Sequence, residues 1–217
     1  MIFESPRVEP LGESAFLVRV GDDVTLKTNA LAVETAAALR RVLPLRIEVV
    51  PAFATVGVIF NPATDGRVTV ESLITEAIRD PQAVAPKPLR RPAIIRIPVT
   101  YDGPDIDAVA AKLGVKRKQL IKLHTGTVYT VMMLGFAPGF AYLGPLSPKL
   151  VLPRRPEPRR HVQPGSVAIA GAHTAVYPLD TPGGWHLIGR TKLVMFDPNR
   201  TPTAFLHAGD QVVFEKE

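Results

Sequence analysis

The chain has 217 residues, 46% of them hydrophobic, so it can bury the core of one elaborate domain or of two small ones. It contains no cysteine, which excludes disulfides, thiolate nucleophiles and cysteine metal sites, and no apolar run approaches the ~20 residues that span a bilayer. The net charge of +6 favours anionic ligands, but the sequence has no zinc finger, RNP motif or helix-turn-helix signature. We therefore expect a soluble cytoplasmic protein that binds neither nucleic acid nor membrane.

The first eighty or so residues alternate between strand-like and helix-like patterns. The segment TVGVIF is rich in β-branched residues and predicts a strand. The segment TVESLITEAIRD predicts a helix because its apolar residues share one face. The predicted order is β-α-β-β-α, with strands at 15–20, 45–50 and 55–60 and helices at 27–43 and 69–80.

A proline-rich basic segment, DPQAVAPKPLRRP at residues 80–92, interrupts both periodicities. Its four prolines lack amide donors and restrict the residues before them, so the segment is typical of a stiff linker. We therefore place a domain boundary here, between an N-terminal domain at residues 1–86 and a second domain at residues 92–217.

The second domain begins with helical patterns and then becomes rich in short strands. A strand at 93–101 and a helix at 105–114, ended by Gly114, precede a further helical segment that reaches His124. Beyond it, short apolar runs are separated by glycine and proline, which is typical of an all-β barrel or sandwich. These runs cover residues 127–134, 166–177, 185–189, 192–196 and 210–215.

Two motifs suggest catalysis but fit it poorly. The segment GWHLIGRT, residues 184–191, matches a phosphate-binding loop only if Arg190 replaces the usual lysine, and its bulky residues favour a strand instead. Ser166 lacks the flanking glycines of a nucleophile elbow, so we expect its hydroxyl to serve a turn or to contact a ligand. The five histidines offer no i, i+4 pair for a metal, and we expect no metal site.

Two other places carry ionisable groups that suit a small-ligand site. His124 lies where an amphipathic helix gives way to a strand, so it is a candidate proton-transfer residue; an exposed or capping histidine is the alternative. The loop LPRRPEPRRHVQPG, residues 152–165, holds Arg159 among prolines, and arginine grips carboxylate or phosphate in a forked geometry. A solvated surface loop is the alternative there.

Taken together, these segments resemble a known family. VMMLGFAPGFAYLG, PRRPEPRRHVQPGSVAIAG, TAVYPLDTPGGWHLIGRT and LVMFDPNRTP, in that order, are similar to the family of KipI and the B subunit of 5-oxoprolinase, also called allophanate hydrolase subunit 1. The resemblance extends back to LGESAFLV at residues 11–18. Ala141 stands where the family often has proline, and His173 where it often has glutamine; the second departure changes the donor pattern at a ligand contact.

The resemblance implies an α+β protein in which a small ferredoxin-like α/β domain precedes a cyclophilin-like β-barrel domain. It also implies a member of a cytoplasmic heteromer, with one partner like KipA, the C subunit of 5-oxoprolinase, and another like its A subunit. The complex would open 5-oxo-L-proline to L-glutamate with ATP and magnesium, and this chain would be inactive alone. The alternative within the family is a KipI-like proteinaceous inhibitor that uses its barrel to bind a sensor histidine kinase.

The implied site is a cleft shared with a partner. His124 is its predicted catalytic residue, and the Gly-Pro-aromatic stretch would form a preshaped wall that excludes water. The predicted substrate-binding residues are Gly135, Phe136, Pro138, Gly139, Phe140, Tyr142, Arg159, Ser166, His173, Thr174 and Arg190.

Overall fold

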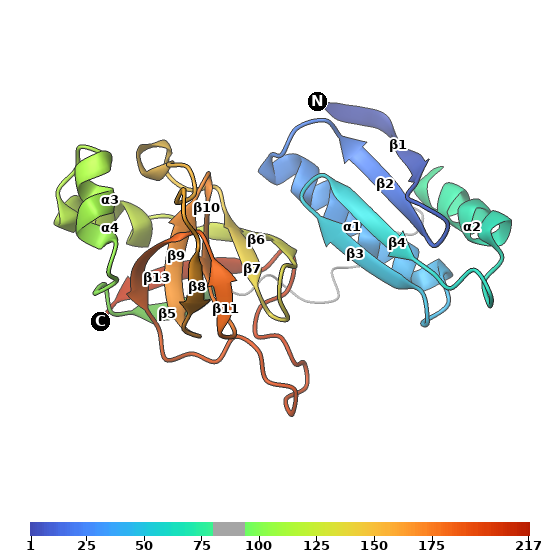
Figure 1. Cartoon of the computed structure of the whole chain (residues 1–217). Coiled ribbons are helices and arrows are strands. Elements are labelled where there is room, and N and C mark those ends of the chain that lie inside the picture. Colours follow the sequence, from blue (N-terminus) through green and yellow to red (C-terminus); the bar gives the residue numbers. More distant parts are fainter. Residues whose placement is uncertain (80–93) are drawn as a thin grey trace. The chain divides into compact units, whose positions relative to one another are not determined.

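The computed structural model describes residues 1–79 and 94–217, which fall into two compact units, Met1–Arg91 and Pro92–Glu217 (Figure 1). The described residues combine four α-helices with mostly antiparallel strands, so the architecture is mixed α/β. The predicted linker at 80–92 lies outside the described residues, and the boundaries at 86 and 92 stay predictions. Each unit is described by itself below.

Unit 1 is an antiparallel sheet in the order β1-β2-β4-β3, covered on one face by two helices. Alternation along the strands decides which face is covered, because Val18 of β2 and Val56 and Val58 of β4 are fully buried against the helices. Its elements are β1 (Ile2–Pro10), β2 (Ala15–Gly21), α1 (Leu26–Val42), β3 (Glu48–Ala52), β4 (Thr55–Ile59) and α2 (Arg67–Arg79).

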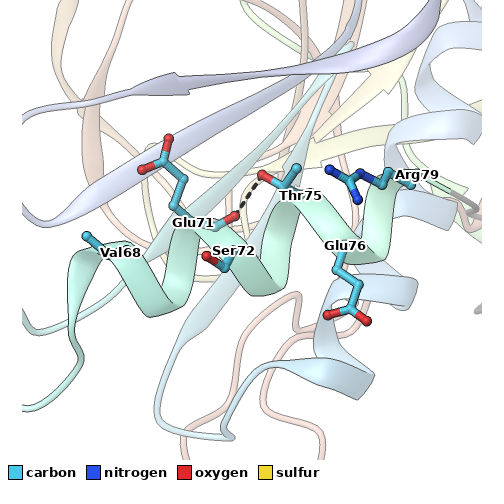
Figure 2. Close-up of a pocket in the computed structure, with 6 residues that line it drawn as sticks. All are labelled: Val68, Glu71, Ser72, Thr75, Glu76 and Arg79. Atoms are coloured by element: carbon cyan, nitrogen blue, oxygen red, sulfur yellow. Dashed lines mark hydrogen bonds between the residues drawn. The ribbon is translucent and has the colours of Figure 1, made fainter.

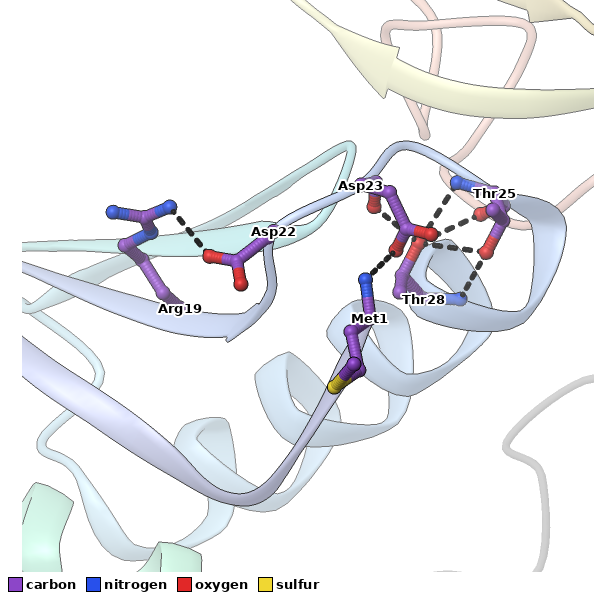
Figure 3. Close-up of polar contacts among 6 residues, drawn as sticks. All are labelled: Met1, Arg19, Asp22, Asp23, Thr25 and Thr28. Atoms are coloured by element: carbon purple, nitrogen blue, oxygen red, sulfur yellow. Dashed lines mark hydrogen bonds and ion pairs between the residues drawn. The ribbon is translucent and has the colours of Figure 1, made fainter.

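The first helix begins at a capping box formed by two threonines. Thr25 Oγ1 accepts the Thr28 amide at 3.1 Å, and Thr28 Oγ1 accepts the Thr25 amide at 2.9 Å (Figure 3). An ion pair between the Met1 amino group and Asp23, at 2.9 Å, lies beside the box. The box satisfies amides that have no partner within the helix, which fixes the start of α1 at Leu26.

The predicted order β-α-β-β-α is confirmed for unit 1, but strand β1 was not predicted. This strand contains two prolines, Pro6 and Pro10, which cannot donate backbone hydrogen bonds, so the sequence pattern does not indicate a strand there. The structure accommodates them because β1 lies at the edge of the sheet, paired with β2. Proline is compatible with such an edge position.

Unit 2 contains two helices followed by a run of short strands, as predicted. The strands alternate with glycine- and proline-rich turns, and β9 and β10 form a tight antiparallel pair. Its elements are β5 (Ile94–Val99), α3 (Ile106–Lys112), α4 (Arg117–Thr125), β6 (Tyr129–Leu134), β7 (Ala141–Gly144), η1 (Pro148–Leu150), β8 (Arg159–Val162), β9 (Ser166–Ala170), β10 (His173–Val176), β11 (Thr181–Gly183), β12 (His186–Arg190) and β13 (Gln211–Lys216).

The main sheet of unit 2 closes on itself. Its strands run in the order β5-β13-β6-β7-β10-β9-β12, and just beyond β5 the backbone of Thr100 exchanges two hydrogen bonds of 2.9 Å with Arg190 of β12. This bridge joins the two edges into a barrel. A Cβ on Gly189 would lie 2.7 Å from the Thr100 carbonyl oxygen, so the closure requires glycine at this position. The short strands of unit 2 therefore form a barrel and not a sandwich, which was the alternative predicted from the sequence.

Two of the sequence-based assignments in unit 2 have clear outcomes. The segment GWHLIGRT contains strand β12, so the phosphate-loop alternative is wrong. The strand predicted at 192–196 is also wrong, since the structure has an irregular loop with one isolated bridge from Phe196 to Ala204. The guanidinium of Arg200 donates to the carbonyls of Val194 and Thr203, so side-chain hydrogen bonds replace the ladder of a sheet.

The barrel strands bury side chains on both of their faces. In β9, Val167 and Ile169 belong to the main core with α3 and α4, whereas Ala168 and Ala170 belong to a second cluster that is rich in aromatic residues. This second cluster contains most of the predicted aromatic site residues.

Among the described residues, no helix has both the length and the apolar character to cross a membrane.

Candidate functional site

An aromatic cluster surrounds Phe140, which is 1% exposed. Its ring makes edge contacts with Phe136, Tyr142, Tyr177 and Trp185, at centroid distances of 5.3, 5.0, 5.2 and 5.6 Å. Such T-shaped pairs are the favoured geometry between aromatic rings. We call these five residues the aromatic wall; the structure therefore brings together the three aromatic residues predicted from the GFAPGFAY segment.

The turn between β6 and β7 presents the outer end of the wall. Phe136 has a φ of 77° and is 62% exposed, and Gly139 also has a φ of 77°. A Cβ on Gly139 would lie 2.7 Å from Phe196 Cβ, so the predicted tight turn at this glycine is observed. Gly135 does not have a positive φ, and Pro138 is exposed on the turn.

The arginine-rich loop is held by Asp105, a residue that no sequence pattern indicated. Asp105 Oδ1 accepts from Arg155 Nη1 at 3.0 Å and from Arg159 Nη2 at 2.7 Å, and Oδ2 accepts the Leu187 amide at 2.7 Å. Burial alone would raise the pKa of Asp105, but the hydrogen bonds from Arg159 and Leu187 and the charges of both arginines together lower it. An aspartate just before a helix is typical of an N-cap residue, so its position in the sequence did not suggest contacts with the two arginines.

Ser166 and Arg190 lie opposite one another, where β9 pairs with β12. Arg190 Nη2 forms an exposed ion pair of 2.8 Å with Asp102, and Ser166 is half-buried. Arg190 is also the residue whose backbone closes the barrel with Thr100. The structure places these two predicted residues at the closure of the barrel, and their predicted ligand contacts stay predictions.

His173 lies at the edge of the wall, with its ring 6.3 Å from that of Tyr142. Burial lowers the pKa of His173, which favours the neutral imidazole. Its neighbour Thr174 points to the opposite face of β10 and is fully buried in the main core. Of these two predicted ligand contacts, only His173 is near the aromatic wall.

His124 lies in the core of unit 2, which corrects its expected position in an open cleft and its alternative as an exposed or capping residue. The side chain is fully buried, and its ring packs on Phe214 at a centroid distance of 4.5 Å. Nδ1 lies 2.7 Å from the Tyr101 hydroxyl and Nε2 lies 2.9 Å from the Thr174 hydroxyl. Burial lowers the pKa of His124 to about 3. Its catalytic role stays a prediction.

Two hollows on the described residues bear on the site. One of about 460 Å³ runs along α2 and is lined by that helix alone, so it has no opposing wall (Figure 2). The other, of about 230 Å³, lies beside the arginine loop. Its lining includes Asp105, Lys112, Arg155 and His186, and His186 Nε2 donates to the Pro153 carbonyl at 3.0 Å. The second hollow is the better candidate for a small anionic ligand.

Comparisons with known proteins define the class to which this site belongs. Residues 6–206 match the family model for the carboxyltransferase domain, subdomain C and D, and the chain belongs to this family. Among its relatives is the B subunit of 5-oxoprolinase from Bacillus subtilis (strain 168), 37% identical over 226 residues, covering 96% of this chain and 91% of that protein. The corresponding B subunit from Escherichia coli O157:H7 is 42% identical over 213 residues, covering 94% and 93%. The resemblance predicted from the motifs is confirmed.

Solved structures support the same fold. The crystal structure of TTHA0988 matches with a TM-score of 0.82 and 35% identity over 94% of this chain, which spans 40% of that longer chain. PH0987 of Pyrococcus horikoshii, a conserved uncharacterized protein, matches with a TM-score of 0.56 and 35% identity over 97% of both chains. The urea amidolyase of K. lactis has a TM-score of 0.74 but 19% identity, so it supports the fold alone.

Proposed function

We propose that this chain is the B-type member of a heteromeric, ATP-dependent 5-oxoprolinase that opens 5-oxo-L-proline to L-glutamate. The observation that carries the proposal is the match to proteins named as the B subunit of 5-oxoprolinase, over 91% and 93% of their length. The partners in this proposal are a C-type protein like KipA and an A-type protein, in the cytoplasm. No observation favours the kinase-inhibitor alternative.

We assign ATP and magnesium to the assembled complex rather than to this chain. Phosphorylation of the lactam oxygen by ATP, with release of ADP, would make the poorly electrophilic amide carbon open to attack by water. The ring C–N bond then breaks, with the amine taking a proton, and hydrolysis of the acyl phosphate releases phosphate and glutamate. GWHLIGRT does not fit a phosphate cradle, because it forms β12 and its residues Trp185, Leu187 and Ile188 are buried. The proposed nucleotide site therefore belongs to a partner.

The contribution of this chain is to bind and orient the substrate. The aromatic wall offers apolar ring edges and faces that would exclude water from a small lactam ring. Arg155 and Arg159 would receive its carboxylate, since arginine presents a forked set of donors to carboxylates.

The architecture of the two units supports the proposed fold classes. The four-stranded sheet with two helices on one face supports a ferredoxin-like class for unit 1, and the closed barrel supports a cyclophilin-like class for unit 2.

The experiment that tests the proposal is reconstitution. The purified chain should form no glutamate from 5-oxoproline with ATP and magnesium, whereas coexpression with the A-type and C-type partners should give a complex that does. Sustained turnover by the chain alone would contradict the shared site. A stable complex without any turnover of 5-oxoproline would contradict the substrate.

A further inference from the structure

We infer that Asp105 is a positioning residue, which fixes Arg155 and Arg159 as a receptor for a carboxylate ligand. The inference deepens the proposed function and rests on it for the identity of the ligand. Asp105 is 6% exposed and precedes α3, while Arg155, in the loop before β8, and Arg159, the first residue of β8, lie 50 and 54 residues away in the sequence. One carboxylate oxygen, Oδ1, accepts from both guanidinium groups.

The carboxylate is itself fixed to the barrel through β12. Its second oxygen, Oδ2, accepts the Leu187 amide at 2.7 Å, and the Asp105 amide donates to the Leu187 carbonyl at 3.0 Å. Backbone and side chain of Asp105 are thus both bonded to a strand of the closed sheet. Because these bonds leave the carboxylate little freedom to rotate, the two arginines are held in a defined orientation.

The charged side chains around Asp105 leave a net positive charge, which suits binding of a monoanion. Lys112, Arg155 and Arg159 carry three positive charges, against two negative charges on Asp105 and Glu157. Within the described part of the chain, Arg159 Nη1 is buried without a hydrogen-bond partner, a sign that one carboxylate does not satisfy both guanidinium groups. The hollow of about 230 Å³ beside Arg155 is large enough for a small carboxylic acid.

An ion pair that only stabilises the fold makes the opposite prediction about ligand affinity. Without positioning, removing the negative charge of Asp105 would leave a more positive hollow, and an anion would bind more tightly. With positioning, the same change releases the arginines, and the anion binds more weakly. The sign of the change therefore separates the two roles.

The first test uses the isolated full chain and does not depend on the substrate. Trypsin cleavage after Arg159 or Arg160 is followed by mass spectrometry in the wild-type chain and in Asp105→Asn. Cleavage should be about tenfold faster in the variant, because β8 and the loop before it open more often when the anchor at Asp105 is lost. The matched control is Asp65→Asn in unit 1, where a carboxylate that is also 6% exposed pairs with Arg46 at 2.5 Å. Unchanged cleavage, or equal acceleration in the control, would overturn the positioning role.

The second test uses the reconstituted complex. For Asp105→Asn the KM for 5-oxoproline should rise about tenfold while kcat stays within about threefold, and Asp65→Asn should leave both parameters unchanged. An unchanged or lower KM would overturn the inference. If Asp105→Asn does not fold, Asp105→Glu, which keeps the negative charge but moves it by one methylene, replaces it in both tests with the same expectations. A wild-type complex that does not use 5-oxoproline would count against the proposed function, and the trypsin result would still decide the positioning role.

Discussion

His124 donates its Nε2 proton to the Thr174 hydroxyl, 2.9 Å away, because that hydroxyl donates its own proton to the Ala168 carbonyl, also at 2.9 Å. Nδ1 must then accept from the Tyr101 hydroxyl at 2.7 Å, so the tautomer of the neutral imidazole is fixed by its partners. Two residues predicted for a ligand site therefore meet, but they do so in the core. The resulting chain of hydrogen bonds, from Tyr101 to Ala168, satisfies every polar side-chain group within it.

The buried neutral His124 predicts a loss of stability in acid. Burial lowers the pKa of His124 to about 3, whereas an unfolded histidine titrates near about 6.5. Between these values the unfolded chain binds a proton that the folded chain does not. The free energy of unfolding should therefore fall as pH falls through this window, by at most about 1.4 kcal/mol per pH unit, and this contribution should be constant above about pH 7.

Urea unfolding of the wild-type chain and of His124→Gln, followed from about pH 4 to pH 8, measures this effect. The variant has no imidazole to protonate at this position, so its stability should depend less steeply on pH. Equal slopes in the two chains would show that His124 does not control the acid sensitivity.

The hydroxyl of Thr174 is predicted to stabilise the core. Thr174→Val leaves both the His124 Nε2 proton and the Ala168 carbonyl without this partner, which should cost about 1–3 kcal/mol. The matched control is Thr181→Val, since Thr181 Oγ1 is buried but has no hydrogen-bond partner among the described residues. Its replacement should change the free energy of unfolding by less than about 0.5 kcal/mol. Similar losses for both variants would contradict the assignment.

The local patterns of this sequence predict its elements better than its long-range contacts. The periodicities of unit 1 and the run of short strands in unit 2 follow from side-chain alternation and from glycine and proline. The burial of His124 also had a local sign, because it lies four residues after Leu120 and so shares the buried face of α4. The position at the end of a helix suggested exposure instead.

Asp105 could not be found in the same way. Its partners, Arg155, Arg159 and Leu187, lie 50, 54 and 82 residues further along the chain, and only the closure of the barrel brings them together. The aromatic wall was easier to predict in part, since Phe136, Phe140 and Tyr142 come from one short segment. Tyr177 and Trp185, which flank β10 and β12, join it through long-range ring contacts that no local pattern specifies.

Closure of the barrel is predicted to fail if Gly189 gains a side chain. A Cβ there would lie 2.7 Å from the Thr100 carbonyl oxygen, which is too close for any relaxed structure. Gly189→Ala should therefore cost about 1–3 kcal/mol, as overpacking does in a rigid core. Gly57→Ala in β4 is the control, because the nearest atom would be 3.8 Å away. The comparison is made by thermal melting, and equal melting temperatures for the two variants would contradict the close approach at the closure.

The last prediction concerns Phe136, whose backbone and side chain are both in unfavourable states. A φ of 77° strains any residue except glycine, and 62% of the ring is exposed to solvent. Such strain is typically retained where it serves a functional contact, and the ring continues the aromatic wall through Phe140, 5.3 Å away. We therefore expect Phe136 to bury its ring against the substrate or the C-type partner.

Phe136→Gly separates the cost of the strain from the benefit of the contact. In the isolated chain the variant should be as stable as the wild type or more stable, by up to about 1 kcal/mol, because glycine adopts a positive φ freely. In the reconstituted complex, partner affinity or kcat/KM should fall at least about tenfold, as for an aromatic anchor in an interface. Val194→Ala, at a side chain that is 58% exposed, controls for the loss of apolar surface and should change neither. Thermal melting, titration of the partner and glutamate release measure the three quantities. Unchanged affinity and turnover in Phe136→Gly would show that the ring has no such contact, and a large loss of stability would show that the strained turn serves the fold alone.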